Sequence, residues 1–118
     1  PVMQALAGRL RQHYPTLEVV TGSADPAGFD IVVNATPLGM KAGDPLPINV
    51  ERIPPHAYVG EVVLSAEVTP FLAAARARGC QGQGGLDMLY EQIPAYLAYF
   101  DLPVATPGQL RALADPMA

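Results

Sequence analysis

Two runs of β-branched residues, neither alternating with polar ones, limit the folds open to this chain more than any other feature. Residues 30–35 read Asp-Ile-Val-Val-Asn-Ala, and residues 58–64 read Tyr-Val-Gly-Glu-Val-Val-Leu. A strand with one face in water alternates apolar and polar residues, whereas a strand of a parallel sheet is covered on both faces and does not. Both runs therefore predict strands that are buried on both faces.

Helical patterns and turn residues separate these strands. Apolar residues recur every four positions over residues 2–14 and Pro15 ends the pattern, which predicts an amphipathic helix. Thr69-Pro70 supplies a capping hydroxyl and a first-turn proline for a second helix, which Gly79 ends. The remaining expected elements are strands at residues 17–20 and 80–83, a helix from Leu86 that Pro94 breaks or kinks before Phe100, and a last helix from Thr106-Pro107.

Short strands that alternate with helices are typical of an α/β domain with a mainly parallel sheet and flanking helices. The chain has 118 residues, and we expect residues 1–118 to form a single domain. In such sheets, ligands bind outside the carboxyl ends of the strands. The residues at those ends are Asn34-Ala35-Thr36, Leu64-Ser65 and Gly82–Gly85. We therefore expect a site where these polar and glycine residues gather.

Composition excludes several classes of protein. Charged residues make up 15% of the chain and hydrophobic residues 50%, which excludes an intrinsically disordered chain. The 7 basic residues are scattered and are outnumbered by 11 acidic ones, so neither nucleic acid nor a membrane surface is an expected partner. No apolar run is long enough to span a bilayer. The one cysteine, Cys80, cannot form an internal disulfide, which fits a reducing cytoplasm.

The segment Asn34-Ala35-Thr36-Pro37-Leu38-Gly39-Met40 places amide and hydroxyl groups at the end of a buried strand. Pro37 and Gly39 favour a turn whose backbone could approach a flat ring closely. Two interpretations stay open: a turn that contacts a ligand, or a strand-end turn whose Asn34 side chain bonds to neighbouring loops. Glu61 lies within an apolar strand, where a carboxylate needs hydrogen-bonding partners. For Glu61 we favour a structural anchor over a part of a polar site.

The run Gly82-Gln83-Gly84-Gly85 precedes a predicted helix, so its amides could face an anion, although a tight strand-to-helix turn is the simpler interpretation. It is not a G-x-G-x-x-G fingerprint, because Asp87 occupies the third glycine position. Asp87 and Glu91 stand four residues apart and share a helix face, which is more often solvated than catalytic. Gln92 points about a third of a turn away and could hydrogen-bond a hydroxylated ligand.

Other reactive side chains lack the arrangement that chemistry requires. The sequence has no metal-ligand spacing, no Ser/His/Asp order and no nucleophile elbow, so we expect no metal site and no hydrolase. His13 and His56 are isolated and are predicted to lie on the surface, and Cys80 is predicted to be an inert core thiol. Five residues of the penultimate helix are expected to face the core: Met88, Leu89, Tyr96, Leu97 and Phe100.

Three motifs together resemble the carboxyl-terminal part of the shikimate dehydrogenase family. They are the Asn34–Met40 segment, then Thr69-Pro70-Phe71-Leu72, then Gly85-Leu86-Asp87-Met88-Leu89-Tyr90-Glu91-Gln92, in the order and spacing of that family. The resemblance covers nearly the whole chain and implies a partial doubly wound, Rossmann-like sheet. It also implies an NADP-dependent oxidoreductase of aromatic amino acid biosynthesis, which transfers hydride between nicotinamide and a ring hydroxyl of shikimate or a related cyclitol.

The same resemblance implies roles for particular residues. Asn34, Ala35 and Thr36 would line the cofactor side of the cleft, the backbone of Val62 would lie beside the nicotinamide, and Gly85 would be a further cofactor contact. Gln92 would hydrogen-bond the substrate. The family usually has aspartate where this chain has Glu61, and a substrate-contacting tyrosine where it has Leu64. These departures favour a divergent member whose substrate is not shikimate itself.

In the family, a substrate domain with catalytic lysine and aspartate precedes the cofactor domain, and neither that domain nor the Gly-rich first strand is in this sequence. Lys41, in the loop after the Asn34 motif, should not inherit the catalytic role. We therefore expect no catalytic residue here, and a carboxyl-terminal part of a nucleotide-binding domain that is inactive alone.

The gap between strand 17–20 and strand 30–35 would leave a sheet edge unpaired, which predicts either closure of the gap or a homodimer through that edge. One alternative is a non-enzymatic module that binds a nucleotide or self-associates on the same scaffold. Another is a different α/β enzyme with convergent turns.

Overall fold

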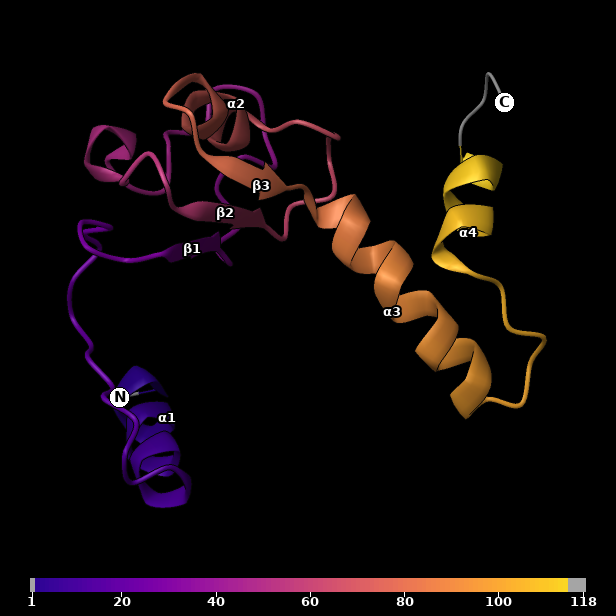
Figure 1. The fold of residues 1–118 in the computed structure, drawn as a ribbon, viewed down its shortest axis with the longest axis horizontal. Helices are drawn as coiled ribbons and strands as arrows, with labels where there is room; N and C mark the ends of the chain where they lie inside the picture. The colour runs from indigo at the N-terminus through magenta and orange to yellow at the C-terminus, as the bar shows by residue number, and fades with distance from the viewer. Residues whose placement is uncertain (1, 115–118) are drawn as a thin grey trace.

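The computed structural model describes residues 2–114 (Figure 1). Residue 1 and residues 115–118, which the predicted domain also included, lie outside the described part. In chain order the elements are α1 (Val2–His13), β1 (Ile31–Asn34), the 3-10 helix η1 (Val50–Arg52), β2 (Tyr58–Glu61), α2 (Pro70–Ala77), β3 (Gln81–Gln83), α3 (Gly85–Tyr99) and α4 (Pro107–Ala114).

The three strands form one parallel sheet in the order β1-β2-β3. Tyr58 at the start of β2 pairs with Ile31 of β1 on one side and with Gln81 of β3 on the other. Helix α2 connects β2 to β3, and together with η1 it covers one face of the sheet. This arrangement confirms the expected α/β class. The core beneath α2 consists of Val50, Ile53, Ala57, Val59, Phe71, Leu72, Ala75 and Cys80.

Local signals set the ends of α2 as the sequence predicts. The Thr69 hydroxyl accepts a hydrogen bond from the backbone N–H of Leu72 at 3.2 Å, and Pro70 occupies the first helical position. At the other end Gly79 adopts φ = 94°, a conformation that L side chains rarely take. Helix α2 is thereby held between two fixed turns above the sheet.

The second face of the sheet is open, so the prediction of strands buried on both faces is wrong. Ile31 is 67% exposed and Val33 55% exposed, and the side chains of Tyr58 and Gln83 hydrogen-bond to each other at 3.0 Å on the exposed side. The physical reason is that no helix among residues 2–114 packs against this face. The strands have the apolar composition of a sheet that is covered on both faces, but only one of their faces is covered.

Helix α1 ends before Pro15 as predicted, but the expected strand at residues 17–20 does not form. This segment is extended and has no neighbouring strand to pair with; it returns along α1 instead (Figure 1). The Gln4 amide donates to the Thr21 hydroxyl at 3.1 Å, and the Arg11 guanidinium donates to the carbonyl of Val19. A β-prone sequence forms a strand only where another strand offers its backbone groups.

The segment that leads from α1 to the sheet is fastened by one ion pair. Two nitrogens of Arg52 donate to the two carboxylate oxygens of Asp25, at 2.8 and 2.7 Å, and the backbone N–H of Ala27 donates to Asp25 as well. The bonds from Arg52, and then that from Ala27, lower the pKa of Asp25 to about 2. The carboxylate is therefore charged at neutral pH, and the pair is lost only as the pH falls towards that value.

Helix α3 runs away from the sheet (Figure 1). It continues through Pro94 to Tyr99, so of the two outcomes expected at this proline, a break or a kink, the break is wrong. Tyr96 and Phe100 are 55% and 67% exposed, and so they do not face a core. Met88, Leu89 and Leu97 are only half-buried. Beyond its first turn α3 packs mainly against α4, because no other layer of residues 2–114 lies beside it.

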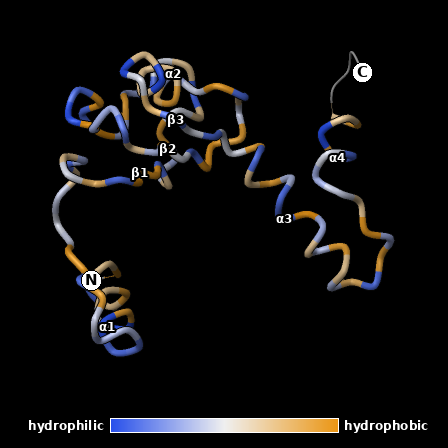
Figure 2. Tube along the Cα trace, in the orientation of Figure 1, coloured by the Kyte–Doolittle hydropathy of each residue, from blue (hydrophilic) through white to orange (hydrophobic). Residues whose placement is uncertain are grey.

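The described chain is open rather than compact. Its radius of gyration is 16.9 Å, whereas a compact domain of this length would have about 13 Å. Hydrophobic positions of α1, the sheet and α3 are orange in Figure 2, and large hydrophobic residues of each of these elements are exposed. Much of the apolar surface thus lies outside the core beneath α2.

Replacing Gly82 with alanine should destabilise the sheet by roughly 2 kcal/mol, the cost of overpacking a tight backbone contact. An added Cβ would lie 2.2 Å from the carbonyl oxygen of Val59 and 3.0 Å from Leu72. The matched control is Gly8→Ala in α1, where an added Cβ meets nothing within 4 Å and helix propensity improves. Urea unfolding followed by circular dichroism compares the two, and equal midpoints for Gly82→Ala and wild type would contradict the close approach.

Candidate functional site at the carboxyl edge of the sheet

A buried carboxylate joins the segments that follow the strands. Glu61, at the end of β2, is 3% exposed. Its Oε1 accepts hydrogen bonds from the Asn34 amide at 2.9 Å and from the backbone N–H groups of Val62 and Val63 at 3.1 and 3.3 Å. Its Oε2 accepts a bond from the Thr69 hydroxyl at 2.9 Å. Glu61 is therefore the anchor that we favoured from the sequence.

The turn after β1 uses every hydrogen-bonding group of the Asn34 side chain. Its Nδ2 donates to Glu61 and also to the carbonyl of Leu38 at 3.0 Å. Its Oδ1 accepts from the backbone N–H of Thr36 at 3.1 Å and from the Thr36 hydroxyl at 2.7 Å. The Thr36 hydroxyl in turn accepts from the N–H of Leu38 at 3.2 Å. Both side chains thus hold the turn, and backbone groups remain to meet a ligand.

The loop beyond this turn is tied back to the end of β2. Gly39 adopts φ = 98°, and its N–H and that of Lys41 both donate to the Asp44 carboxylate at 3.0 Å. The Ser65 hydroxyl donates to the carbonyl of Gly39 at 3.3 Å. The ends of β1 and β2 therefore share one bonded loop system.

The glycines before α3 allow a close approach of backbone to backbone. A Cβ on Gly84 would lie 2.7 Å from the carbonyl oxygen of Glu67, and a Cβ on Gly85 would lie 2.4 Å from that of Val63. Neither position has room for a side chain. The run is thus a tight strand-to-helix turn, and the first amides of α3 are set directly beside the end of β2.

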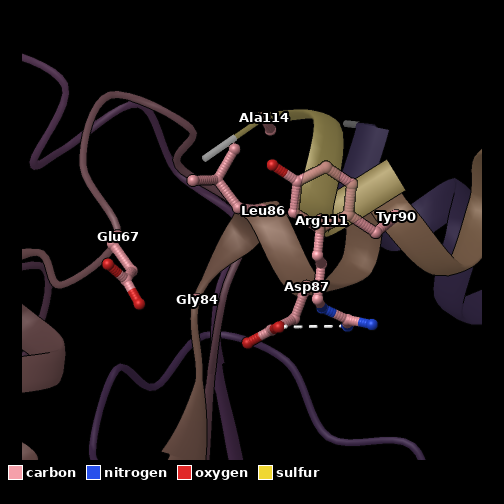
Figure 3. Close-up of a pocket in the computed structure, with 7 residues that line it drawn as sticks. All are labelled: Glu67, Gly84, Leu86, Asp87, Tyr90, Arg111 and Ala114. Atoms are coloured by element: carbon pink, nitrogen blue, oxygen red, sulfur yellow. Dashed lines mark hydrogen bonds and ion pairs between the residues drawn. The ribbon is translucent and has the colours of Figure 1, made fainter. Parts of the chain in front are cut away.

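A cavity of about 390 Å³ lies between α3, α4 and the loop after β2 (Figure 3). Arg111 of α4 donates to Asp87 at 3.2 Å and to Glu91 at 3.3 Å, and its guanidinium lies 5.4 Å from the centre of the Tyr90 ring. The bond to Asp87, and then that to Glu91, raises the pKa of Arg111. The remaining lining residues are Glu67, Gly84, Leu86 and Ala114. Asp87 and Glu91 share a face as predicted, but their partner Arg111 lies in a separate helix and was missed.

No group of three His, Cys, Asp or Glu side chains among residues 2–114 could hold a metal ion. Over the same residues, no helix has the length and apolar character needed to cross a membrane. His13 and His56 are exposed, and His56 lies 3.2 Å from Asp30. Cys80 is buried.

Comparison with known proteins gives this edge a context. No protein-family model matches the chain. The shikimate dehydrogenase (NADP+) of Acidiphilium cryptum is 42% identical over 94 residues, which cover 78% of this chain and 34% of that protein. The chain belongs to the shikimate dehydrogenase family over the residues that it spans. It spans about a third of the length of the curated relatives it matches.

Solved structures of the shikimate dehydrogenase family have the same fold. The quinate dehydrogenase of Corynebacterium glutamicum, solved with NAD, has a TM-score of 0.77 and 32% identity, and the match covers 93% of this chain and 41% of that one. The Thermus thermophilus enzyme, solved with NADP(H) and shikimate, has a TM-score of 0.66 and 26% identity, with 78% and 35% covered. The partial doubly wound arrangement expected from the sequence is thus confirmed.

The structure brings together most of the residues that the family resemblance singled out. The N–H of Val62 donates to the carbonyl of Asn34 at 3.2 Å, and a Cβ on Gly85 would lie 2.8 Å from the Val62 carbonyl. Gln92 is exposed and lies roughly 10 Å along α3 from Gly85, given the rise of a helix. Among residues 2–114 it bonds only to the Tyr96 hydroxyl, at 3.3 Å. The assigned roles stay predictions.

Replacing Asn34 with aspartate should destabilise this family member by about 3 kcal/mol, since a second buried carboxylate would face Glu61 and the Leu38 carbonyl without a donor. The matched control is Asn49→Asp, at the cap of η1. Its exposed side chain only accepts a bond, from the N–H of Glu51, and aspartate can accept it too. Urea midpoints should fall for the first variant and stay unchanged for the second. A stable Asn34→Asp protein would show that the amide donates no important bond.

Proposed function

We propose that this chain supplies part of the dinucleotide-binding half of an NADP-dependent, shikimate dehydrogenase-like oxidoreductase. In that enzyme, hydride would pass between nicotinamide and a ring hydroxyl of shikimate or a related cyclitol, a reaction type of aromatic amino acid biosynthesis. The observation that carries the proposal is the edge formed by Asn34–Thr36, Val62 and Gly85, where the Glu61 network and two side-chain-free glycines hold the backbone. Preorganised backbone groups at the carboxyl edge of a parallel sheet suit a dinucleotide.

The substrate is proposed to differ from shikimate at one contact. Leu64 is 47% exposed just beyond β2, where the family usually has a tyrosine. A leucine can contact an apolar part of a ligand but cannot hydrogen-bond a ring hydroxyl. The likeness to a quinate dehydrogenase supports a related cyclitol as substrate. Gln92 is the proposed hydrogen-bonding contact from α3.

The chain by itself is proposed to be inactive. Proton transfer to or from the reacting hydroxyl needs an acid or base within hydrogen-bond reach. Lys41 is the one lysine of the sequence, and it lies in the loop that Asp44 closes. The chain's span of about a third of its relatives supports the view that the acid–base groups belong to a part of the enzyme outside it.

The chain is expected to bind NADPH but to show no NADP+-linked oxidation of shikimate or quinate. NADPH fluorescence measures the binding. Gly85→Ala should weaken it by about tenfold, because overpacking of one to a few kcal/mol moves the start of α3 away from Val63. Gly108→Ala is the control, since its nearest atom would be 4.0 Å away. Turnover by the chain alone would overturn the proposal.

We also propose, as the second candidate, that two copies associate through the outer edge of β1. This strand pairs with β2 on one side only, and Ile31 and Val33 are exposed beside the free edge. An open strand with apolar side chains is a template for another strand. A self-associating, non-enzymatic module would use the same edge.

Sedimentation should therefore give a mass near twice the 12.4 kDa of one chain. Ile31→Lys should restore the monomer, because a lysine on an edge strand opposes pairing. Leu113→Lys is the control, an equally apolar but remote position on α4 that is 82% exposed. A wild-type monomer at all concentrations would exclude this association.

Finally, we propose a cytoplasmic location. Cys80 is a free, buried thiol whose Sγ lies 3.5 Å from the carbonyl of Pro54, and free thiols are usual in a reducing compartment.

A further inference from the structure

We propose that Glu61 is a positioning residue that couples the cap of α2 to the turn after β1. Its carboxylate would thereby fix the backbone groups that meet a dinucleotide. This inference rests on the proposed function only for its second part, the effect on binding. The coupling itself can be tested without any ligand.

The division of bonds between the two carboxylate oxygens carries the inference. Oε1 holds the Asn34 amide and the backbone after β2, whereas Oε2 holds only the Thr69 hydroxyl. One rigid group thus touches the ends of β1 and β2 and the start of α2. Glu61, Asn34 and Thr69 are all at least nine-tenths buried, so water does not compete for these bonds.

The hydroxyl of Thr69 has a fixed direction because it is a donor and an acceptor at the same time. It donates a hydrogen bond to Glu61, and its oxygen accepts one from the N–H of Leu72, which caps α2. The hydrogen bond to Glu61 therefore orients the cap, and the cap orients the carboxylate. A valine at position 69 would fill similar space but would remove both bonds.

The orientation of the Asn34 amide follows from the same carboxylate. A carboxylate accepts hydrogen bonds, so the NH₂ end of the Asn34 amide must face Glu61. The oxygen end is then turned towards the N–H and hydroxyl of Thr36. A shift of Glu61 would release this amide, and the turn at residues 34–38 would lose its central bonds.

The experiment measures amide hydrogen exchange and NADPH binding on the 118-residue chain. Thr69→Val should speed exchange at Thr36 and Leu38 by about tenfold, the scale of one lost buried bond, although the N–H of each residue bonds to a group other than Thr69. Affinity for NADPH should fall by a similar factor. Thr69→Ser keeps the hydroxyl and should restore both measurements to within about twofold of wild type.

The matched control is Thr106→Val. Thr106 also accepts a helix-start N–H, that of Gln109, but it lies before α4 outside the network. Thr106→Val should change the amide exchange rates of α4 alone. If Thr69→Val speeds exchange at Leu72 and leaves Thr36 and Leu38 unchanged, Glu61 does not couple the two segments and the inference is overturned.

Glu61→Gln provides a second variant in case Thr69→Val does not fold. Its Oε1 can still accept three bonds, but its NH₂ meets the Thr69 hydroxyl, so the cap of α2 should loosen and the Asn34 turn should exchange faster with it. Faster exchange at the cap with unchanged protection of the Asn34 turn in this variant would also contradict the coupling. If the variants change exchange as expected but the wild type binds no NADPH, the proposed function fails and the coupling stands.

Discussion

The rest of the site depends on one constraint, which is that the carboxylate of Glu61 is held in the apolar interior. A buried charge is costly unless donors surround it, and the fold supplies four of them within 3.3 Å. Those donors belong to β1, to the residues after β2 and to the start of α2. Satisfying a single carboxylate therefore fixes the relative positions of three segments, one of which, the end of β1, lies 27 residues away in the sequence.

The same site lies in a fold whose other surfaces are incomplete. A parallel sheet normally has helices on both faces, whereas among the described residues α2 and η1 cover one face only. The outer edge of β1 is not paired with another strand of residues 2–114. The bonded network and the core beneath α2 lie on the covered side of the sheet. The carboxyl edge is thus held by local contacts that do not require the open face to be covered.

Features that depend on neighbouring residues could be predicted from the sequence, and those that depend on distant ones could not. The cap at Thr69, the turn at Gly79 and the anchor at Glu61 follow from the chemistry of each residue and its surroundings. The predictions of a strand at residues 17–20 and of core-facing residues on α3 are wrong. Each of these features needs a neighbouring strand or helix, and the local sequence pattern carries no information about whether one is present. Arg111 was missed because it meets Asp87 across 24 residues.

Stability and selectivity are separated at this edge. Asn34, Glu61 and Thr69 are buried, and every hydrogen-bonding group of the Asn34 amide is used within the protein. Such side chains hold the backbone, but they have nothing left to offer a ligand. Leu64 is exposed beside them and none of their bonds depends on it. A residue at position 64 can therefore change without disturbing the network, so under the proposed function it is the position at which a ligand contact can vary.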